Sequence, residues 1–232
     1  MARIRRIPVL AVASALLLTA CAAPPRTAQQ DAAVRSVAIV SQLDEAAPVL
    51  RLGITIFGNE KKILDQGGKL NEMAVETVKQ HLGNSRPNWN VKVATPKMAM
   101  TADGKPAERM TAAELAALAQ SLGVDQLFVL NGASYDNSPG HGTGVVTRPL
   151  GFGLLSVSVH SFITLTVMDR NGVTLLDRGV GSDGVKNAKA DELGLTSDLK
   201  SLDAPAVSAN VSAALQKRTR EVVDVLMTSA NY

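Results

Sequence analysis

Three polar residues, Asn131, Ser134 and Asp136, follow directly after an apolar run, residues 124–130, that is typical of a buried strand. Ligands of α/β sheets bind beyond the carboxyl ends of the strands, so these side chains are the best-placed group for binding. Ser134 lacks the GxSxG elbow of an esterase, and residues of these types also form turns. We therefore expect a ligand- or partner-binding role for them and no catalytic residue.

His141 lies in a glycine-rich stretch, Pro139-Gly-His-Gly-Thr-Gly144. The phosphate-cradling signature requires a lysine that this stretch lacks, and the dinucleotide fingerprint requires a following helix, whereas a strand is predicted here. A hairpin or lid loop is the favoured interpretation. His141 is kept as a further candidate for binding a ligand or partner.

The three histidines, His81, His141 and His160, are far apart in the sequence. They form no HxxxH or HExxH pair, and no second thiol exists to complete a zinc set, so we expect neither a metal nor a cofactor. A site assembled from distant residues stays open. His160 is predicted on the polar face of a strand and is retained as a binding candidate. Asp44 and Glu45 are expected to be solvated charges in a loop.

The only cysteine, Cys21, ends a segment that begins with Arg3, Arg5 and Arg6 and continues with an apolar run over residues 7–18. This is the pattern of a secretory signal, too short to span a membrane comfortably. Its end, Leu18-Thr19-Ala20-Cys21, resembles the motif of bacterial lipoprotein signals. The resemblance implies that Cys21 is diacylated on sulfur, becomes the new N-terminus and is acylated on nitrogen. The alternative is an ordinary signal with an incidental cysteine.

The residues after Cys21 bear on where the protein resides. In lipoproteins an Asp at the next position implies retention in the inner membrane, and here Ala22 follows, which favours the periplasmic face of the outer membrane. Residues 21–33 are small or polar and predict an acylated, flexible tether. The expected organisation is a signal peptide over 1–20, this tether, and one periplasmic domain over 34–232.

The charge balance argues against nucleic acid as a partner. The chain has 24 basic and 21 acidic residues, and the signal segment alone contains three of the arginines. The remainder is therefore balanced, 21 against 21, and it has no basic run interleaved with aromatic residues. The membrane, reached through Cys21, and an envelope protein are the expected partners. An oligomer is compatible with the sequence.

The first half of the body predicts alternating strands and helices. Strands are expected over 34–41, 50–57, 89–94 and 124–130 from their apolar and β-branched content. A helix is expected over about 69–82, and another begins at Thr111, where Thr111 and Glu114 form a capping-box pattern. Such an order with short connections predicts an α/β layer with partly parallel pairing.

The second half predicts a hairpin and a final helix. Residues 135–150 are expected to form a loop, and 155–168 one long strand, because apolar and polar residues alternate without a break. Asn171-Gly172 predicts a type I′ turn into a return strand over 173–180, at the edge of the sheet. A loop over 181–203 and a helix over about 204–227 complete a two- or three-layer α/β domain with a mixed sheet.

Two segments resemble a family of periplasmic α/β domains. They are the helix and strand at 115–130 and the alternating strand with its hairpin at 162–176. The family includes the curli-export lipoproteins and the amino-terminal domain of the Tol-system propeller protein. The resemblance implies a role in envelope assembly or export. Pore formation would need long additional hairpins, and here only the 150–180 segment could serve.

Three functions therefore compete. The favoured one is a non-enzymatic, lipid-anchored envelope protein that binds a partner or supports assembly of an envelope or secretion complex. The loop 136–150 and the hairpin after it would face the partner, and the outer strand face could accept a partner's strand, unless that face is simply wetted. That face comprises Ser156, Ser158, His160, Thr164 and Thr166. The alternatives are a periplasmic hydrolase or small-ligand-binding protein with its site near Asn131, Ser134 and Asp136, and a pore or export subunit.

Overall fold

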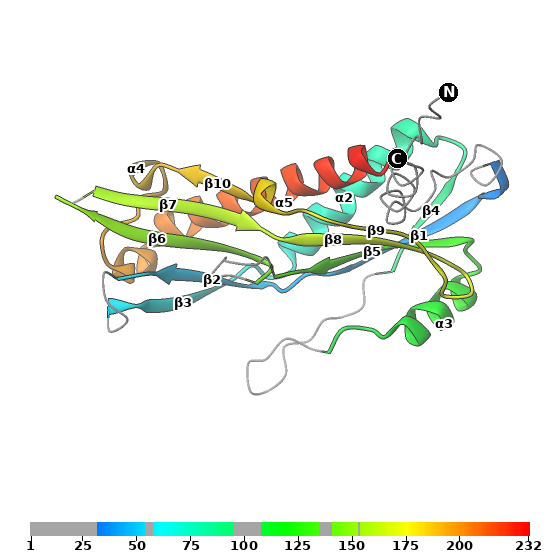
Figure 1. The fold of residues 1–232 in the computed structure, drawn as a ribbon, viewed down its shortest axis with the longest axis horizontal. Helices are drawn as coiled ribbons and strands as arrows, with labels where there is room; N and C mark the ends of the chain where they lie inside the picture. Colours follow the sequence, from blue (N-terminus) through cyan, green and yellow to red (C-terminus); the bar gives the residue numbers. More distant parts are fainter. Residues whose placement is uncertain (1–31, 54–57, 95–107, 135–140, 153) are drawn as a thin grey trace, which may run out of the picture. The chain divides into compact units, whose positions relative to one another are not determined.

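The structure, a computed structural model, describes residues 32–53, 58–94, 108–134, 141–152 and 154–232 (Figure 1). Two five-stranded sheets run through these residues, and helices cover their faces. The predicted α/β class is confirmed, and parallel and antiparallel pairs occur in both sheets. Cys21, the signal segment and Asp136 lie outside the described residues.

The first sheet is covered on both faces. In its strand β1 (Ser36–Gln42), Val37 and Ile39 contact one apolar cluster, and Ala38 and Val40 contact another. Alternate strand residues point to opposite faces, so continuous burial along β1 requires packing on both sides. In spatial order the sheet consists of β4 (Asn90–Val93), β1, β5 (Gln126–Gly132), β8 (Ile163–Asp169) and β9 (Thr174–Gly179).

The second sheet continues the strands of the first. Its order is β10 (Val185–Ala188), β7 (Leu154–Ser161), β6 (Thr143–Gly151), β2 (Ala46–Arg51) and β3 (Glu60–Asp65). The chain passes from one sheet to the other between β1 and β2, between β5 and β6, and between β7 and β8. It crosses again between β3 and β4 and between β9 and β10. At this junction Phe162 donates its N–H to the Gly142 carbonyl, and Ala133 donates to the Phe162 carbonyl, each at 2.8 Å.

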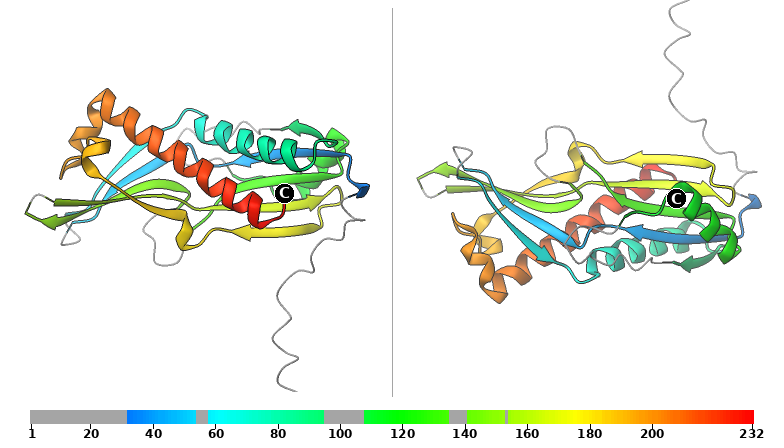
Figure 2. Two further views of the ribbon diagram at one scale, coloured as in Figure 1. Left: turned by 90° about the horizontal axis from the view of Figure 1, so that it is seen from above. Right: turned by 90° about the horizontal axis from the view of Figure 1, so that it is seen from below.

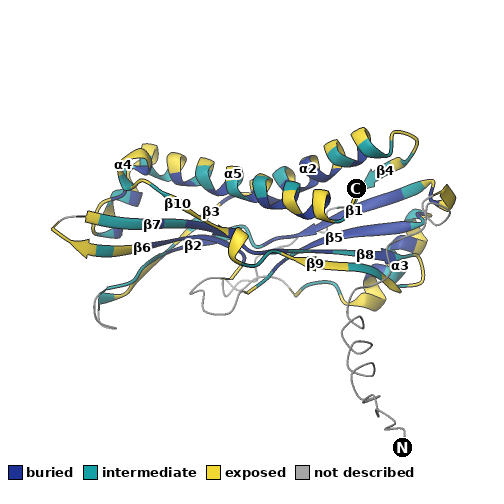
Figure 3. Cartoon of the chain, turned by 45° about the horizontal axis from the view of Figure 1, so that its top comes forward, coloured by how far each residue is buried: buried dark blue, intermediate teal, exposed yellow. Residues whose placement is uncertain are grey.

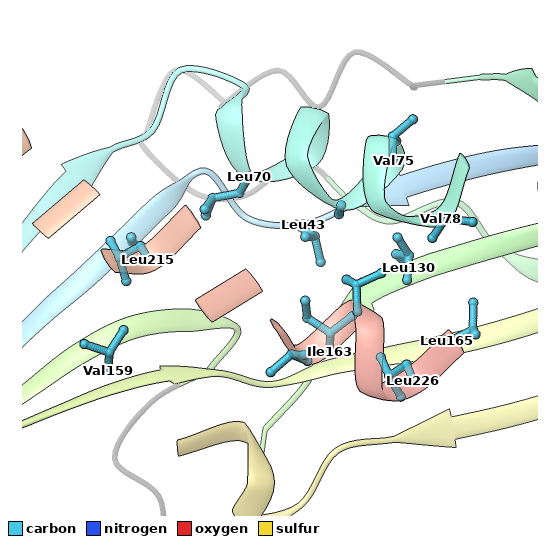
Figure 4. Close-up of a cluster of buried hydrophobic side chains, with 14 of the residues drawn as sticks. Leu43, Leu70, Val75, Val78, Leu130, Val159, Ile163, Leu165, Leu215 and Leu226 are labelled. Atoms are coloured by element: carbon cyan, nitrogen blue, oxygen red, sulfur yellow. The ribbon is translucent and has the colours of Figure 1, made fainter. Parts of the chain in front are cut away.

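Two long helices lie on one face of the sheets, and a shorter one lies on the other (Figures 1 and 2). Helices α2 (Lys69–Ser85) and α5 (Pro205–Ser229) bury their apolar stripes against the strands. On the opposite face of the first sheet, α3 (Ala112–Leu122) begins with the predicted capping box between Thr111 and Glu114. Figure 4 shows part of the main core between α2, α5 and the strands: Leu43, Leu70, Leu130, Ile163, Leu215 and Leu226.

The predicted single strand over 155–168 is in fact two strands in different sheets. Strands β7 and β8 are separated by Phe162, whose side chain is fully buried at the junction. Apolar alternation continues through the break because Val159, Ile163 and Val167 face the same core from both sheets. The period of two is therefore preserved although the pairing partners change.

The prediction that this strand could accept a partner's strand is wrong. β7 lies between β6 and β10, and β8 lies between β5 and β9. Their main-chain groups are already used along most of their length. His160 is also not on a wetted face, because it is 1% exposed.

The predicted loop over 135–150 is wrong from Thr143 onward, where β6 begins and residues 143–147 are buried. Gly144 is required here by close packing and not by flexibility. A Cβ atom on it would lie 2.7 Å from the Pro48 carbonyl oxygen and 2.9 Å from Cε1 of His160. Glycine within a strand often marks such a close approach. Residues 135–140 lie outside the described residues.

The β8–β9 hairpin lies at the edge of the first sheet, as predicted, but its turn is not type I′. Only Gly172 has positive φ, at 83°, whereas Asn171 does not. Gly172 donates to the Asp169 carbonyl at 3.0 Å, and Asp169 donates to the Val173 carbonyl at 2.9 Å. The connection is thus a three-residue loop that ends in a left-handed glycine.

Two edge strands were missed, and one strand was misplaced. The strand predicted over 50–57 is β2, which ends at Arg51, and residues 54–57 lie outside the described residues. Strands β3 and β10 are largely polar and exposed, so apolar alternation does not reveal them. Charged residues on edge strands are a common protection against unwanted pairing.

Candidate functional site

Four polar side chains meet at the junction of the two sheets, and we call them the junction cluster. His141 accepts or donates at both ring nitrogens: Nδ1 lies 2.8 Å from Oγ of Ser134, and Nε2 lies 2.8 Å from Nη2 of Arg109. The Asp44 carboxylate lies 3.5 Å from Nε2 of His141 and 3.7 Å from Nη2 of Arg109. The cluster joins three segments that are distant in sequence.

The fold brings these segments together through the parallel pair β1 and β5. Gln42 and Asn131 lie side by side in that pair, so Asp44 and Ser134, which follow them, leave the sheet at the same edge. Ser134 and His141 then form an isolated antiparallel bridge. Gly132 leaves room for the cluster, because a Cβ on it would lie 3.3 Å from Nη2 of Arg109.

Ser134, His141 and Asp44 contact one another in the same succession as the serine, histidine and aspartate of a hydrolytic triad. The proton of the imidazole ring, however, is on a different nitrogen from the one that catalysis requires. Arg109 carries only donors and stays charged, so Nε2 of His141 must accept from it. Nδ1 then holds the ring proton and donates to the Ser134 hydroxyl. An imidazole in this state cannot remove the hydroxyl proton, which a nucleophilic serine requires. The geometry instead supports a hydrogen-bonded link across the junction.

The structure places the predicted site residues in two locations. Ser134 and His141 belong to the junction cluster, and Asn131 lies beside it, where its Oδ1 accepts from Nε2 of Gln42 at 3.3 Å. His160 lies in the second sheet, outside the cluster. As a binding site this group stays a prediction.

Asp44 and Arg109 were missed as members of the cluster. Asp44 was expected to be solvated, yet its side chain is only 15% exposed. Its neighbour Glu45 is not a free surface charge either, since its carboxylate accepts from the Asn71 N–H at 2.9 Å and the Leu70 N–H at 3.3 Å, at the start of α2. Neither contact follows from a local motif, because each partner is distant in sequence.

His160 is a buried neutral side chain. Burial lowers its pKa from 6.5 to about 4, so the imidazole is uncharged at neutral pH. Its ring stacks on Phe162 at 5.2 Å between centroids. Nε2 has no hydrogen-bond partner among the described residues. These contacts assign a packing role to His160.

A second feature of the surface is the end of the β6–β7 hairpin, residues 148–156, which we call the hairpin end. Three large apolar side chains are exposed there: Leu150 by 65%, Phe152 fully and Leu154 by 64%. Figure 3 shows exposed residues at this end of β6 and β7. Phe152 also has a positive φ of 51°, a conformation that costs a residue with a bulky side chain about 1 kcal/mol or more. Three large exposed apolar side chains within five residues make this end a candidate interaction surface.

The hairpin end extends beyond the neighbouring strands (Figures 1 and 2). Among the described residues, β2 pairs with β6 only up to Thr147, and β10 pairs with β7 only from Val157. The segment between these limits is thus paired only with itself, through β6 and β7. Within the described residues, its apolar tip is therefore exposed for contact.

In the described ranges, no group of three His, Cys, Asp or Glu side chains is arranged to hold a metal ion. Every helix in the described part is too short or too polar to cross a membrane.

No family model matches the chain, and no curated protein matches it. Among solved structures, the PelC dodecamer from Paraburkholderia phytofirmans is 12% identical, with 85% of this chain and 87% of that chain covered and a TM-score of 0.33. The hypothetical protein CT253 from Chlamydia trachomatis is 13% identical, with 85% and 98% covered and a TM-score of 0.31. The lipoprotein GNA1162 from Neisseria meningitidis is 14% identical, with 77% and 95% covered and a TM-score of 0.25. The function of this chain must be argued from its own surfaces.

Proposed function

We propose that this chain is a non-enzymatic, lipid-anchored protein of the bacterial cell envelope that binds a protein partner through its hairpin end. The observation that carries the proposal is the set of three exposed apolar side chains, Leu150, Phe152 and Leu154. Buried aromatic anchors supply much of the binding energy at protein interfaces. The anchor we propose is acylated Cys21, and Ala22 after it favours the periplasmic face of the outer membrane.

The position of the hairpin end favours a protein partner over the anchoring bilayer. The chain runs through β1 and β2 from Ser36 to Arg51, which ends near the base of the hairpin end (Figure 1). Such a strand path covers roughly 50 Å. Residues 21–33 reach at most about 45 Å when fully extended. Suppose that the hairpin end were inserted in the bilayer that anchors Cys21, with its strands perpendicular to the membrane. Val34 would then lie farther from the membrane than residues 21–33 can span.

The proposal is tested by replacing Leu150, Phe152 and Leu154 together with Ser and cross-linking the acylated protein in its own envelope. We expect the cross-linked partner to be lost while acylation and folding are retained. The matched control is Val225→Ser, which removes an exposed apolar side chain from α5. Retention of the partner by the triple variant would contradict the proposal. So would binding of the protein's hairpin end to protein-free phosphatidylglycerol vesicles.

The order of Ser134, His141 and Asp44 favours a second candidate, hydrolysis or binding of a small ligand at the junction cluster. It requires Arg109 to leave Nε2 of His141, so that Nδ1 can accept the serine proton. A serine-reactive phosphonate probe distinguishes the two functions. Labelling that Ser134→Ala abolishes would establish a nucleophile, whereas our proposal predicts no labelling of Ser134.

A further inference from the structure

A cleft of about 190 Å³ opens between β10, β7, α4 (Ala190–Leu193) and α5. Its apolar lining comes from Val159, Ala188, Leu193 and Ala214. Val159 and Leu193 are buried core residues, so the inner wall of the cleft is continuous with the main core.

The rim of the cleft is charged, and three of its charged side chains pair with one another. Glu221 accepts from Nζ of Lys186 at 3.1 Å and from Nη1 of Arg218 at 2.8 Å. Burial raises the pKa of Glu221, but the hydrogen bonds from Arg218 and Lys186 outweigh it, and the pKa lies below its ordinary value. Glu221 thus stays ionised and paired at neutral pH. These three charges satisfy one another, and Glu192 pairs with Lys189 outside the cleft. Lys217 also lines the cleft. The apolar lining is the part that an apolar group would contact.

The volume of the cleft is large enough for a single aromatic ring. An apolar protein cavity of about 150 Å³ accommodates a benzene molecule. Among the described residues, Phe152 has a fully exposed aromatic ring, and Leu150 and Leu154 flank it on the same hairpin end. Since Phe152 is fully exposed, it does not occupy the cleft of its own chain.

We propose that the hairpin end of one copy inserts Phe152 into this cleft on a second copy. This inference rests on the proposed function and names the partner as the chain itself. The contact is heterologous, because two different surfaces meet, so each copy offers one hairpin end and one cleft. Repeated contacts of this type give a closed ring if the rotation closes and a filament if it does not.

Two variants separate the surfaces. Phe152→Asn removes the ring from the hairpin end, and Ala214→Trp fills the cleft. Each variant alone, acylated and purified in detergent, should lose self-association by about 30-fold or more in light scattering. A 1:1 mixture should form dimers and no larger species, because one variant keeps its cleft and the other keeps its ring.

Further variants make the result decisive. Ala188→Asp, on the other wall of the cleft, substitutes for Ala214→Trp if that variant fails to fold. The double variant Phe152→Asn with Ala214→Trp gives the baseline for association through detergent alone. A larger fraction of dimer in the 1:1 mixture than in the double variant supports the inference.

Failure of this inference can be told from failure of the proposed function. If the parent chain is monomeric, or the mixture stays at the baseline, the second copy is not the occupant. A different cross-linked protein that still depends on Phe152 would then leave the proposed function standing. If neither self-association nor any cross-link depends on the hairpin end, both fail.

Discussion

At the scale of single residues, His160 couples the stability of the fold to pH. Its pKa is about 4 in the fold and 6.5 at its ordinary value, so between these values the unfolded chain binds a proton that the folded chain does not. Stability should therefore fall as pH decreases from about 6.5 to 4, by about 3 kcal/mol for this group. Urea unfolding at several pH values should show a shallower dependence in His160→Gln.

The control for this comparison is Val225→Ser, which changes an exposed side chain of α5 that carries no titratable group. It should keep the pH dependence of the parent protein. Carboxylates titrate in the same pH range and also affect stability. Their contribution is the same in parent and variant, so it cancels when the variant's free energy of unfolding is subtracted from the parent's at each pH. An unchanged curve in His160→Gln would show that the buried imidazole is not the group responsible.

Phe152 is the residue at which stability and function should respond in opposite directions. Asn tolerates positive φ better than Phe, and no buried contact is lost at a fully exposed side chain. Phe152→Asn should therefore raise the free energy of unfolding by about 1 kcal/mol while weakening association. Thermal unfolding and light scattering on the same sample measure the two effects. A loss of both would point to a structural role for the ring.

The candidate site was predicted only in part, and the reason lies in single residues. Asn131 and Ser134 follow a recognisable strand, so their place at a sheet edge could be inferred. Asp44 and Arg109 reach the same place from other segments, through the parallel pairing of β1 with β5 and the chain before α3. Long-range contacts of this kind have no local motif, and the sequence alone does not reveal them.

At the scale of elements, helix α2 contains a glycine whose replacement should stabilise the fold. Gly83 is exposed within α2, its φ is not positive, and a Cβ on it would meet nothing within 4 Å. Gly83→Ala should raise the free energy of unfolding by about 0.5–1 kcal/mol, because glycine costs about that much within a helix. Chemical denaturation measures the change.

The opposite sign is expected at Gly194, which ends α4 with φ of 72°. A Cβ there would lie 3.0 Å from Cγ2 of Val207 and would also sit in an unfavourable backbone conformation. Gly194→Ala should therefore destabilise the fold. Equal effects at both positions would refute the argument from backbone conformation.

Elements with strong local signals were predicted well, and elements set by pairing were not. The capping box at Thr111 and the left-handed Gly123 fix α3 at both ends, so its bounds follow from the sequence. By contrast, β6 is rich in glycine and proline yet pairs with β7 along its length and with β2 up to Thr147. Its strand character comes from its neighbours and not from its own composition.

At the scale of the whole described unit, one buried side chain links the strands to α2. Asn71 of α2 accepts from the Leu43 N–H at 2.9 Å and donates to the Leu43 carbonyl at 2.9 Å, at the point where β1 passes into β2. Removing the amide leaves buried backbone groups without partners. Asn71→Ala should lower the free energy of unfolding by about 3 kcal/mol.

Asn84→Ala is the matched control, since Asn84 is an exposed asparagine on the same helix. It should change stability by less than about 0.5 kcal/mol. Because α5 packs against strands of both sheets, we also expect one unfolding transition in Asn71→Ala and in the parent. Two separate transitions would mean that the sheets are independent units.

The lipid anchor concerns the whole molecule, since it decides where every other surface acts. If Cys21 is acylated, Cys21→Ala should leave the chain unprocessed or release it into the periplasm, and radiolabelled palmitate should no longer be incorporated. One acyl chain binds a bilayer only marginally, whereas the three chains of a lipoprotein anchor bury far more methylene groups. Phe152→Asn is the control, because it should keep the anchor and the label while losing association. A Cys21→Ala protein of normal mobility in the membrane fraction would exclude the lipoprotein assignment, and an envelope role would then need another means of attachment.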